Sequence, residues 1–238
     1  MFVEPRTIPV FPLDLVLFPR QELPLTVFEP RYKQMVEDCM MGDKLFGVCL
    51  AGRDSIEGWR APVRVGTMTK ITSCRDEGLD GLRLNIGTVG RGRFRILELV
   101  PPCMEMPPDY DPASLEGHRR FAELHQKAGG GKAYIRARVE MIPEMDQSIS
   151  VSQWKSMVDA WKRQAARRAD RGVDPESLDM HLDMHLKQYY LATDTPTPEY
   201  VYSLAALGAG SPEDLQPILE ADTAEDLVER VVSLMEAD

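Results

Sequence analysis

Cysteine is scarce in this chain of 238 residues, and its four cysteines are scattered. They include no close pair such as C-x-x-C, and this pattern argues against both a disulfide framework and a zinc site. We therefore expect buried, reduced thiols, as in a cytosolic protein. The positions are Cys39, Cys49, Cys74 and Cys103.

Long apolar runs are missing as well. No stretch approaches the roughly 20 apolar residues that a helix needs to span a bilayer. The first six residues lack the basic start and apolar core of a secretory signal. With 43% hydrophobic and 28% charged residues, the composition is typical of an ordinary soluble globular protein. We therefore expect a cytoplasmic location and no membrane partner.

Positively charged residues are scarce in the second half of the chain, and the formal net charge of the whole chain is −10. Residues 1–147 carry 20 Lys/Arg and 21 Asp/Glu, a net of −1, whereas residues 148–238 carry 8 and 17, a net of −9. An acidic chain repels phosphate backbones, which disfavours nucleic acid as a partner. The asymmetry also supports two bodies with different surfaces.

Recognisable catalytic and cofactor motifs are also lacking. The glycines before Lys132 resemble part of a phosphate loop, but the full pattern needs glycine and Ser/Thr where this chain has Gln126 and Ala133. The chain contains no G-x-S-x-G and no cysteine with a catalytic flank. We therefore predict no enzyme activity and no cofactor.

A histidine pair is the strongest metal candidate. His181 and His185 lie four residues apart on a predicted helix, a spacing at which two imidazoles can share a metal. The H-E-x-x-H motif has glutamate after the first histidine, and here that residue is Leu182. A partly exposed helix flank explains the pair better, so no metal site is predicted.

Short apolar pieces broken by prolines fill residues 8–50. Because proline removes a ladder donor, each piece is predicted to be a short strand, an edge or a bulge. Pro30 suits the first turn of a helix, and apolar residues at helical spacing follow it up to Gly42. A buried strand over residues 45–50 is predicted next.

From Pro62 onward, apolar and polar residues alternate, which indicates half-buried strands. Three glycines, at positions 87, 90 and 92, predict a hairpin with a bulge. Residues 76–81 predict a polar turn. A proline-rich stretch and a helix over residues 114–128 form an insertion at about 101–132, before a last strand over 135–141. Strands this short favour a sandwich or barrel.

After Pro143, apolar stripes at helical spacing replace the alternation. One stripe consists of Leu178, Leu182, Leu186 and Tyr189. Helix starts are predicted where a capping side chain precedes proline or acidic residues, at Asp174, Ser211 and Thr223. The predicted fold class is therefore α+β. Residues 1–147 are predicted to form a β-rich domain that contains one early helix, and residues 148–238 an all-α domain.

Several separated pieces of the chain resemble, in the same order, the N-terminal domain of the Lon family in its free-standing bacterial form. This resemblance implies a small PUA-like β-barrel followed by helices, which binds polypeptide segments or partner proteins. It also implies the binding part of that family without ATPase or protease modules. The pieces are Pro-Val-Phe-Pro-Leu at 9–13, Leu-Pro-Leu at 23–25, Phe-Glu-Pro-Arg-Tyr at 28–32, Phe-Gly-Val at 46–48, Val-Gly-Thr at 65–67 and Gly-Arg-Gly-Arg-Phe-Arg at 90–95.

The predicted function is non-catalytic polypeptide binding, with apolar segments held in a groove between the barrel and the helices. Irregular strand edges can accept an extended peptide by β-augmentation. For any one of the aromatic residues in the opening stretch, a place in the barrel core is the simpler interpretation. The candidate peptide-binding residues are Phe11, Phe18, Phe28, Arg31, Tyr32 and Phe94.

RNA binding is the alternative, because PUA-like barrels include RNA binders and Arg91, Arg93 and Arg95 flank Phe94. Alternation weakens this hypothesis, since it predicts an inward Phe94 and a solvated face of arginines.

A third hypothesis, a small enzyme of unrecognised chemistry, requires a deep pocket with converging ionisable groups. The oligomeric state is left open by the sequence.

Overall fold

The computed structural model of the chain describes residues 4–76, 83–145, 149–169, 174–208 and 210–237. It divides into two compact units, residues 1–143 and 144–238, called here the barrel unit and the helical unit. The barrel unit contains β1 (Arg6–Leu13), β2 (Leu25–Val27), α1 (Pro30–Met41), β3 (Leu45–Ile56), β4 (Trp59–Pro62), β5 (Val65–Asp76), β6 (Leu84–Val100), α2 (Leu115–Lys127) and β7 (Arg136–Met141). The polar turn predicted at 76–81 lies, apart from Asp76, outside the described residues.

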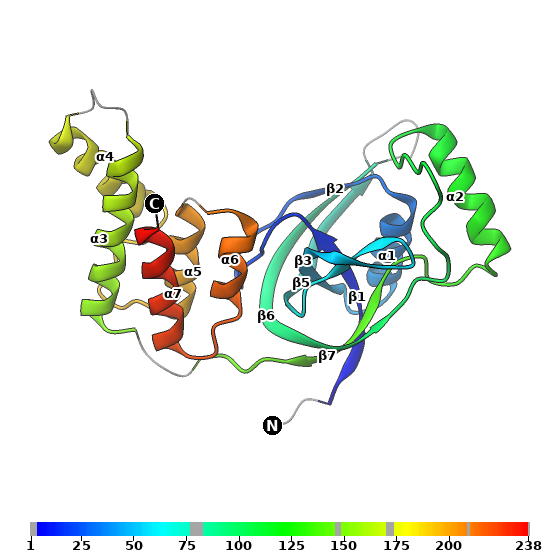
Figure 1. Cartoon of the computed structure of the whole chain (residues 1–238), viewed down its shortest axis with the longest axis horizontal. Helices are drawn as coiled ribbons and strands as arrows, with labels where there is room; N and C mark the ends of the chain where they lie inside the picture. The colour runs from blue at the N-terminus through cyan, green and yellow to red at the C-terminus, as the bar shows by residue number, and fades with distance from the viewer. Residues whose placement is uncertain (1–3, 77–82, 146–148, 170–173, 209, 238) are drawn as a thin grey trace. The chain divides into compact units, whose positions relative to one another are not determined.

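The strands of the barrel unit pair in a closed ring. β1 pairs in parallel with β3 and antiparallel with β7, and antiparallel pairings link β3 to β5, β5 to β6 and β6 to β7. In Figure 1, β6 curves around much of this unit. β2 and β4 attach outside the ring, to β6 and β3. The predicted β-rich, barrel-like first half is therefore confirmed.

Two prolines lie inside β1, and its pairing shows where each of them stands in the sheet. Residues 6–9 pair with β7 and residues 10–13 pair with β3. Because β1 changes partner between Pro9 and Val10, Pro9 ends one ladder and Pro12 lies within the other. Successive side chains point to opposite faces, so Val10 joins one buried cluster and Phe11 the other.

The predicted hairpin around Gly87, Gly90 and Gly92 is wrong, because β6 is one strand of 17 residues that runs through all three glycines. The predicted irregularity is present, since the β5–β6 register shifts next to Gly87 and between Gly90 and Arg93. Gly90 permits a close backbone approach instead of a turn. A Cβ atom there would lie 2.6 Å from the carbonyl oxygen of Phe18. The segment that contains Phe18 is bound to β6, since Gly90 N donates to Gln21 O at 2.8 Å.

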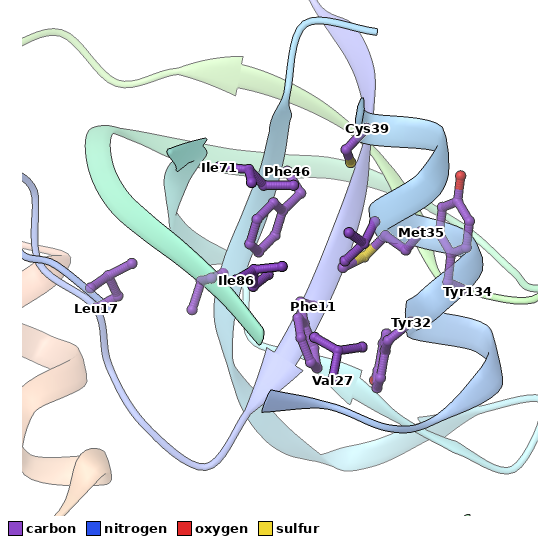
Figure 2. Packing of buried hydrophobic residues seen from close by; sticks show 12 residues of the cluster. Phe11, Leu17, Val27, Tyr32, Met35, Cys39, Phe46, Ile71, Ile86 and Tyr134 are labelled. Carbon is purple, nitrogen blue, oxygen red and sulfur yellow. The ribbon is translucent and has the colours of Figure 1, made fainter. Parts of the chain in front are cut away.

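Helix α1 begins and ends where the sequence predicts. Pro30 occupies its first turn and Gly42 is its C-cap residue. Its buried face packs Tyr32, Met35 and Cys39 against Phe11 and other apolar side chains of the strands (Figure 2). The predicted helix of the insertion is also confirmed as α2, whose cap Ser114 accepts a hydrogen bond from Gly117 N.

Asp38 ties α1 to the residues just before β7. Its carboxylate accepts hydrogen bonds from Lys132 Nζ at 2.7 Å and from Tyr134 Oη at 2.6 Å. Burial raises the pKa of Asp38, but these hydrogen bonds outweigh that effect and hold the pKa below its usual value. A depressed folded-state pKa stabilises the fold above the unfolded-state pKa of about 4, and this stabilisation is lost as the pH falls.

Asp38→Asn is therefore expected to lower the free energy of unfolding at pH 7 by about 1 kcal/mol, because Lys132 is partly exposed. The deficit relative to the parent should shrink as the pH falls below about 4. Urea denaturation checks this in a single-tryptophan chain, in which Trp154 and Trp161 are phenylalanine and Trp59 reports on the barrel unit. Asp54→Asn, at an exposed position, is the control. A deficit that is constant with pH would contradict the expectation.

The helical unit contains α3 (Val151–Arg168), α4 (Pro175–Gln188), α5 (Pro198–Leu207), α6 (Pro212–Leu219) and α7 (Ala224–Glu236). Helix α3 packs mainly against α7. The predicted caps are confirmed, because the side chains of Asp174, Ser211 and Thr223 each accept a bond from a backbone N–H in the first turn. The all-α prediction for this half is also confirmed.

Candidate functional site

Two strand edges of the barrel unit flank one groove. Among the described residues, β4 pairs with β3 alone. The pairing of β5 with β6 begins at Val65 and Arg95, so within the described chain residues 96–100 of β6 pair with β7 and with no β5 residue. The groove has a volume of about 570 Å³ and is lined by residues of β3, β4 and β6 and by residues 63–64, which link β4 to β5.

The crossing of the chain from β4 to β5 opens this groove. The carbonyl oxygen of Arg64 accepts a hydrogen bond from Ile96 N at 2.8 Å, next to the first β5–β6 pair. On the opposite wall, a Cβ atom on Gly52 would lie 3.1 Å from the carbonyl oxygen of Ala61. Glycine thus lets β3 and β4 approach closely where their register shifts.

The groove combines an apolar lining with exposed charges of both signs. The side chain of Leu97 is the most exposed of its large apolar residues, at 47%. The apolar lining residues are Ile56, Ala61, Pro62, Val63, Ile96, Leu97 and Leu99. The exposed charged residues are Arg53, Asp54, Arg64 and Glu98. Apolar pockets beside strand edges are suited to an extended polypeptide, since the edges offer main-chain hydrogen bonds that do not depend on its sequence.

The residues predicted to bind peptide lie elsewhere. All six are described, and five are buried, whereas Phe28 is 39% exposed. The structure brings Phe11, Arg31 and Tyr32 together, since the guanidinium of Arg31 lies over the Tyr32 ring and the ring centroids of Phe11 and Tyr32 are 3.9 Å apart. Figure 2 shows the rings of Phe11 and Tyr32 next to each other. Phe94 belongs to a separate buried cluster. Their role in peptide binding stays a prediction, and the groove is lined by other residues.

Arg31 lies in a buried aromatic sandwich. Its Cζ atom is 4.1 Å from the ring centroid of Tyr32 and 3.8 Å from that of Trp59, and its Nε donates to Glu29 at 2.8 Å. Tyr110 packs edge-on against Trp59. Burial raises the pKa of Tyr32, and the adjacent guanidinium partly opposes that rise. Sequence reasoning missed Trp59, because no spacing links it to residue 31.

Phe94 is fully buried because two glycines make room for its ring. A Cβ atom on Gly47 or on Gly66 would lie 2.5 Å or 2.8 Å from Phe94 Cζ. The RNA hypothesis needs an exposed aromatic ring on which a base can stack, and Phe94 does not supply one. The predicted solvated arginine face is wrong for Arg93, which is 5% exposed, although Arg91 and Arg95 are exposed.

The histidine pair singled out as a metal candidate does not belong to a cluster of metal-ligating side chains within the described residues. His181 Nδ1 lies 2.6 Å from the carbonyl oxygen of Ser177, and the described residues contain no group of three or more His, Cys, Asp or Glu arranged to hold a metal ion. All four cysteines are described and are free thiols, and burial raises the pKa of Cys39 to about 12. In the described part of the chain, no helix has the length and apolar character needed to cross a membrane.

Solved structures share this fold over nearly their whole length. A Lon N-terminal domain protein from Xanthomonas campestris has a TM-score of 0.60 and 20% identity, over 96% of this chain and 98% of that one. The N-terminal domain of a Mycobacterium avium complex Lon protease has a TM-score of 0.58 and 11% identity, over 97% and 98%. At these identities the likeness shows the fold alone.

Curated relatives match a shorter stretch. Cereblon from Danio rerio is 33% identical over 96 residues, and cereblon from Gallus gallus is 34% identical over 96 residues. Each match covers 40% of this chain and about a fifth of the cereblon chain. A family model described as the ATP-dependent protease La (LON) substrate-binding domain matches residues 7–237. The chain therefore belongs to the Lon substrate-binding domain family, as its resemblance predicts.

Proposed function

We propose that this chain is a non-catalytic polypeptide-binding module, and that it holds an extended, partly apolar segment in the groove between β4 and β6. Membership of a substrate-binding family supports the class of ligand. The single observation that supports the location is the apolar groove flanked by two strand edges. All of its lining residues belong to the barrel unit.

In this proposal, main-chain groups of the strand edges bind the backbone of the segment, while alternate side chains enter the apolar lining around Leu97. The cations of Arg53 and Arg64 and the carboxylates of Asp54 and Glu98 favour segments with mixed charge. Because backbone recognition is largely independent of sequence, one groove can bind many unfolded chains. The module binds such segments and leaves their peptide bonds intact.

A reduced, alkylated model protein that stays unfolded tests the proposal. Fluorescence anisotropy of the labelled probe is expected to show saturable binding to the full chain. Leu97→Glu should weaken that binding by about tenfold, because it places a charge in the apolar lining. The mass of the probe should be unchanged after long incubation.

Leu115→Glu is the matched control, since Leu115 is 58% exposed at the start of α2, outside the groove. Its affinity for the probe is expected to stay within about twofold of the parent, because glutamate is favourable in the first turn of a helix. Equal losses in the two variants would place binding elsewhere. Cleavage of the probe by the purified chain would contradict the non-catalytic part of the proposal.

A further inference from the structure

Most side chains of helix α4, in the helical unit, are exposed to solvent or only half-buried. Of its 14 residues, all of which are described, Leu186 alone is buried. Leu178 and Leu182, which share its predicted apolar stripe, are half-buried, and Tyr189 at the end of the stripe is 48% exposed. A single amphipathic helix is stable in a protein mainly through burial of its apolar face. The predicted stripe is therefore only partly covered in this structure.

A second apolar pair lies on α4 outside that stripe. Met180 and Met184 are 57% and 49% exposed, and their spacing of four residues places them side by side on one helix face. They line a hollow of about 470 Å³ together with other residues of α4. Methionine is flexible and polarisable, and exposed methionines are common on surfaces that adapt to helical partners.

Acidic residues surround the methionine pair. Glu176, Asp179 and Asp183 line the same hollow, with Lys187 at its end. Lys162 of α3 pairs with both aspartates, at 2.7 and 2.6 Å, and so holds α4 against α3. Lys162 and Lys187 offset two of the three carboxylates, and the half of the chain to which α4 belongs has a net charge of −9. A cationic partner is attracted to this surface, whereas an anionic one is repelled.

An independent observation lies just beyond the end of α4. Tyr190 has a φ of +57° and is 83% exposed. The backbone there forms a helix-ending turn in which Leu191 N donates to Leu186 O at 2.7 Å, a position where glycine is usual. A bulky residue in this conformation is strained, and such strain is concentrated at functional sites. This turn leaves the ring of Tyr190 exposed to solvent, where it is available to a partner.

From these observations we propose that α4 is a docking site for a basic amphipathic helix of a partner protein. The apolar face of that helix packs on Met180 and Met184, and its lysine or arginine residues face Glu176. A second copy of this chain is a poor occupant, because its net charge is −10. This site is separate from the groove of the barrel unit and from the function proposed for it.

The test uses a labelled peptide of leucine and lysine in amphipathic order, roughly 18 residues or five helical turns long. Saturable binding to the full chain is expected, with affinity that falls as salt is added. The double variant Met180→Gln/Met184→Gln should weaken binding at least about tenfold. The matched control, Met40→Gln/Met41→Gln, changes two exposed methionines of α1 and should leave the affinity unchanged.

Further arms distinguish docking on α4 from attraction by charge alone, from membrane binding and from binding in the barrel groove. A lysine–serine peptide of equal charge should not saturate, and binding equal to that of the amphipathic peptide would overturn the proposal in favour of charge alone. Vesicles rich in anionic lipid should not bind, and binding that the Met180→Gln/Met184→Gln chain loses would assign the face to membranes instead. Leu97→Glu should leave the amphipathic peptide bound, and loss of binding in that variant would place the peptide in the barrel groove.

Discussion

Gly66→Ala is expected to lower the free energy of unfolding of the barrel unit by about 3 kcal/mol, at the upper end of the usual range for overpacking. A Cβ atom at this position would lie 2.5 Å from the carbonyl oxygen of Val48 and 2.8 Å from Phe94 Cζ, and it would also collide with Cys49 Sγ. The backbone oxygen belongs to β3, which is paired with β5 inside the ring. Relief of the contact therefore requires a shift of the whole β3–β5 ladder.

The matched control is Gly92→Ala, in β6 of the same ring. A Cβ atom there would lie 3.1 Å from Met141 Cε, the far end of a flexible side chain that can move aside. Its free energy of unfolding is expected to stay within about 1 kcal/mol of the parent. Urea denaturation of the single-tryptophan chain measures both variants. If Gly66→Ala had the same urea midpoint as the parent, the spacing between β3 and β5 would be able to widen without a loss of stability, which would contradict the expectation.

Three of the motifs that carry the family resemblance meet at this point of the barrel. Gly47 and Gly66 lie against the ring of Phe94 on neighbouring strands, and residue 66 is the register partner of residue 94. These motifs therefore encode the packing of the barrel. All residues that line the groove lie outside the motifs of the resemblance, which is why the resemblance identifies the fold and the family but does not point to Leu97 as a contact.

Local chemistry was sufficient to predict the helices and their caps. Pro30, Asp174 and Ser211 each precede or begin a helix for reasons that act within one turn. The three glycines of β6 were misread because a turn and a close backbone approach both favour glycine. At Gly90, only the position of the segment that contains Phe18, which is distant in sequence, distinguishes the two.

The groove could be predicted only in part. Alternation predicts the outward position of Leu97, but a single exposed leucine is ordinary on a protein surface and does not by itself indicate a contact. The groove itself depends on where β5 begins relative to the end of β6, which the period of the alternation does not determine. Likewise, the burial of Arg93 depends on neighbours that are remote in the chain, so alternation alone misplaced it.

Arg31→Ala is expected to have the second large effect, a loss of about 3 kcal/mol in the free energy of unfolding of the barrel unit. The side chain is 10% exposed, and its removal leaves the mostly buried carboxylate of Glu29 without this partner. It also removes the cation between the rings of Tyr32 and Trp59. Arg31→Lys should lose about half as much, because it keeps a charge but not the planar group that stacks.

Two further variants show which contact matters. Arg31→Ala with Glu29→Gln should recover part of the loss, since the orphaned group is then neutral. Arg60→Ala removes an exposed arginine of β4 that pairs with Asp14, and it should lose less than about 1 kcal/mol. Because Trp59 begins β4, one edge of the groove, Arg31→Ala is also expected to weaken binding of the unfolded probe. Urea midpoints of the single-tryptophan chain measure the stability effects, and the affinity for the unfolded probe measures the binding effect. Equal urea midpoints for Arg31→Ala and Arg60→Ala would contradict a stabilising role for the sandwich of Arg31 between Tyr32 and Trp59.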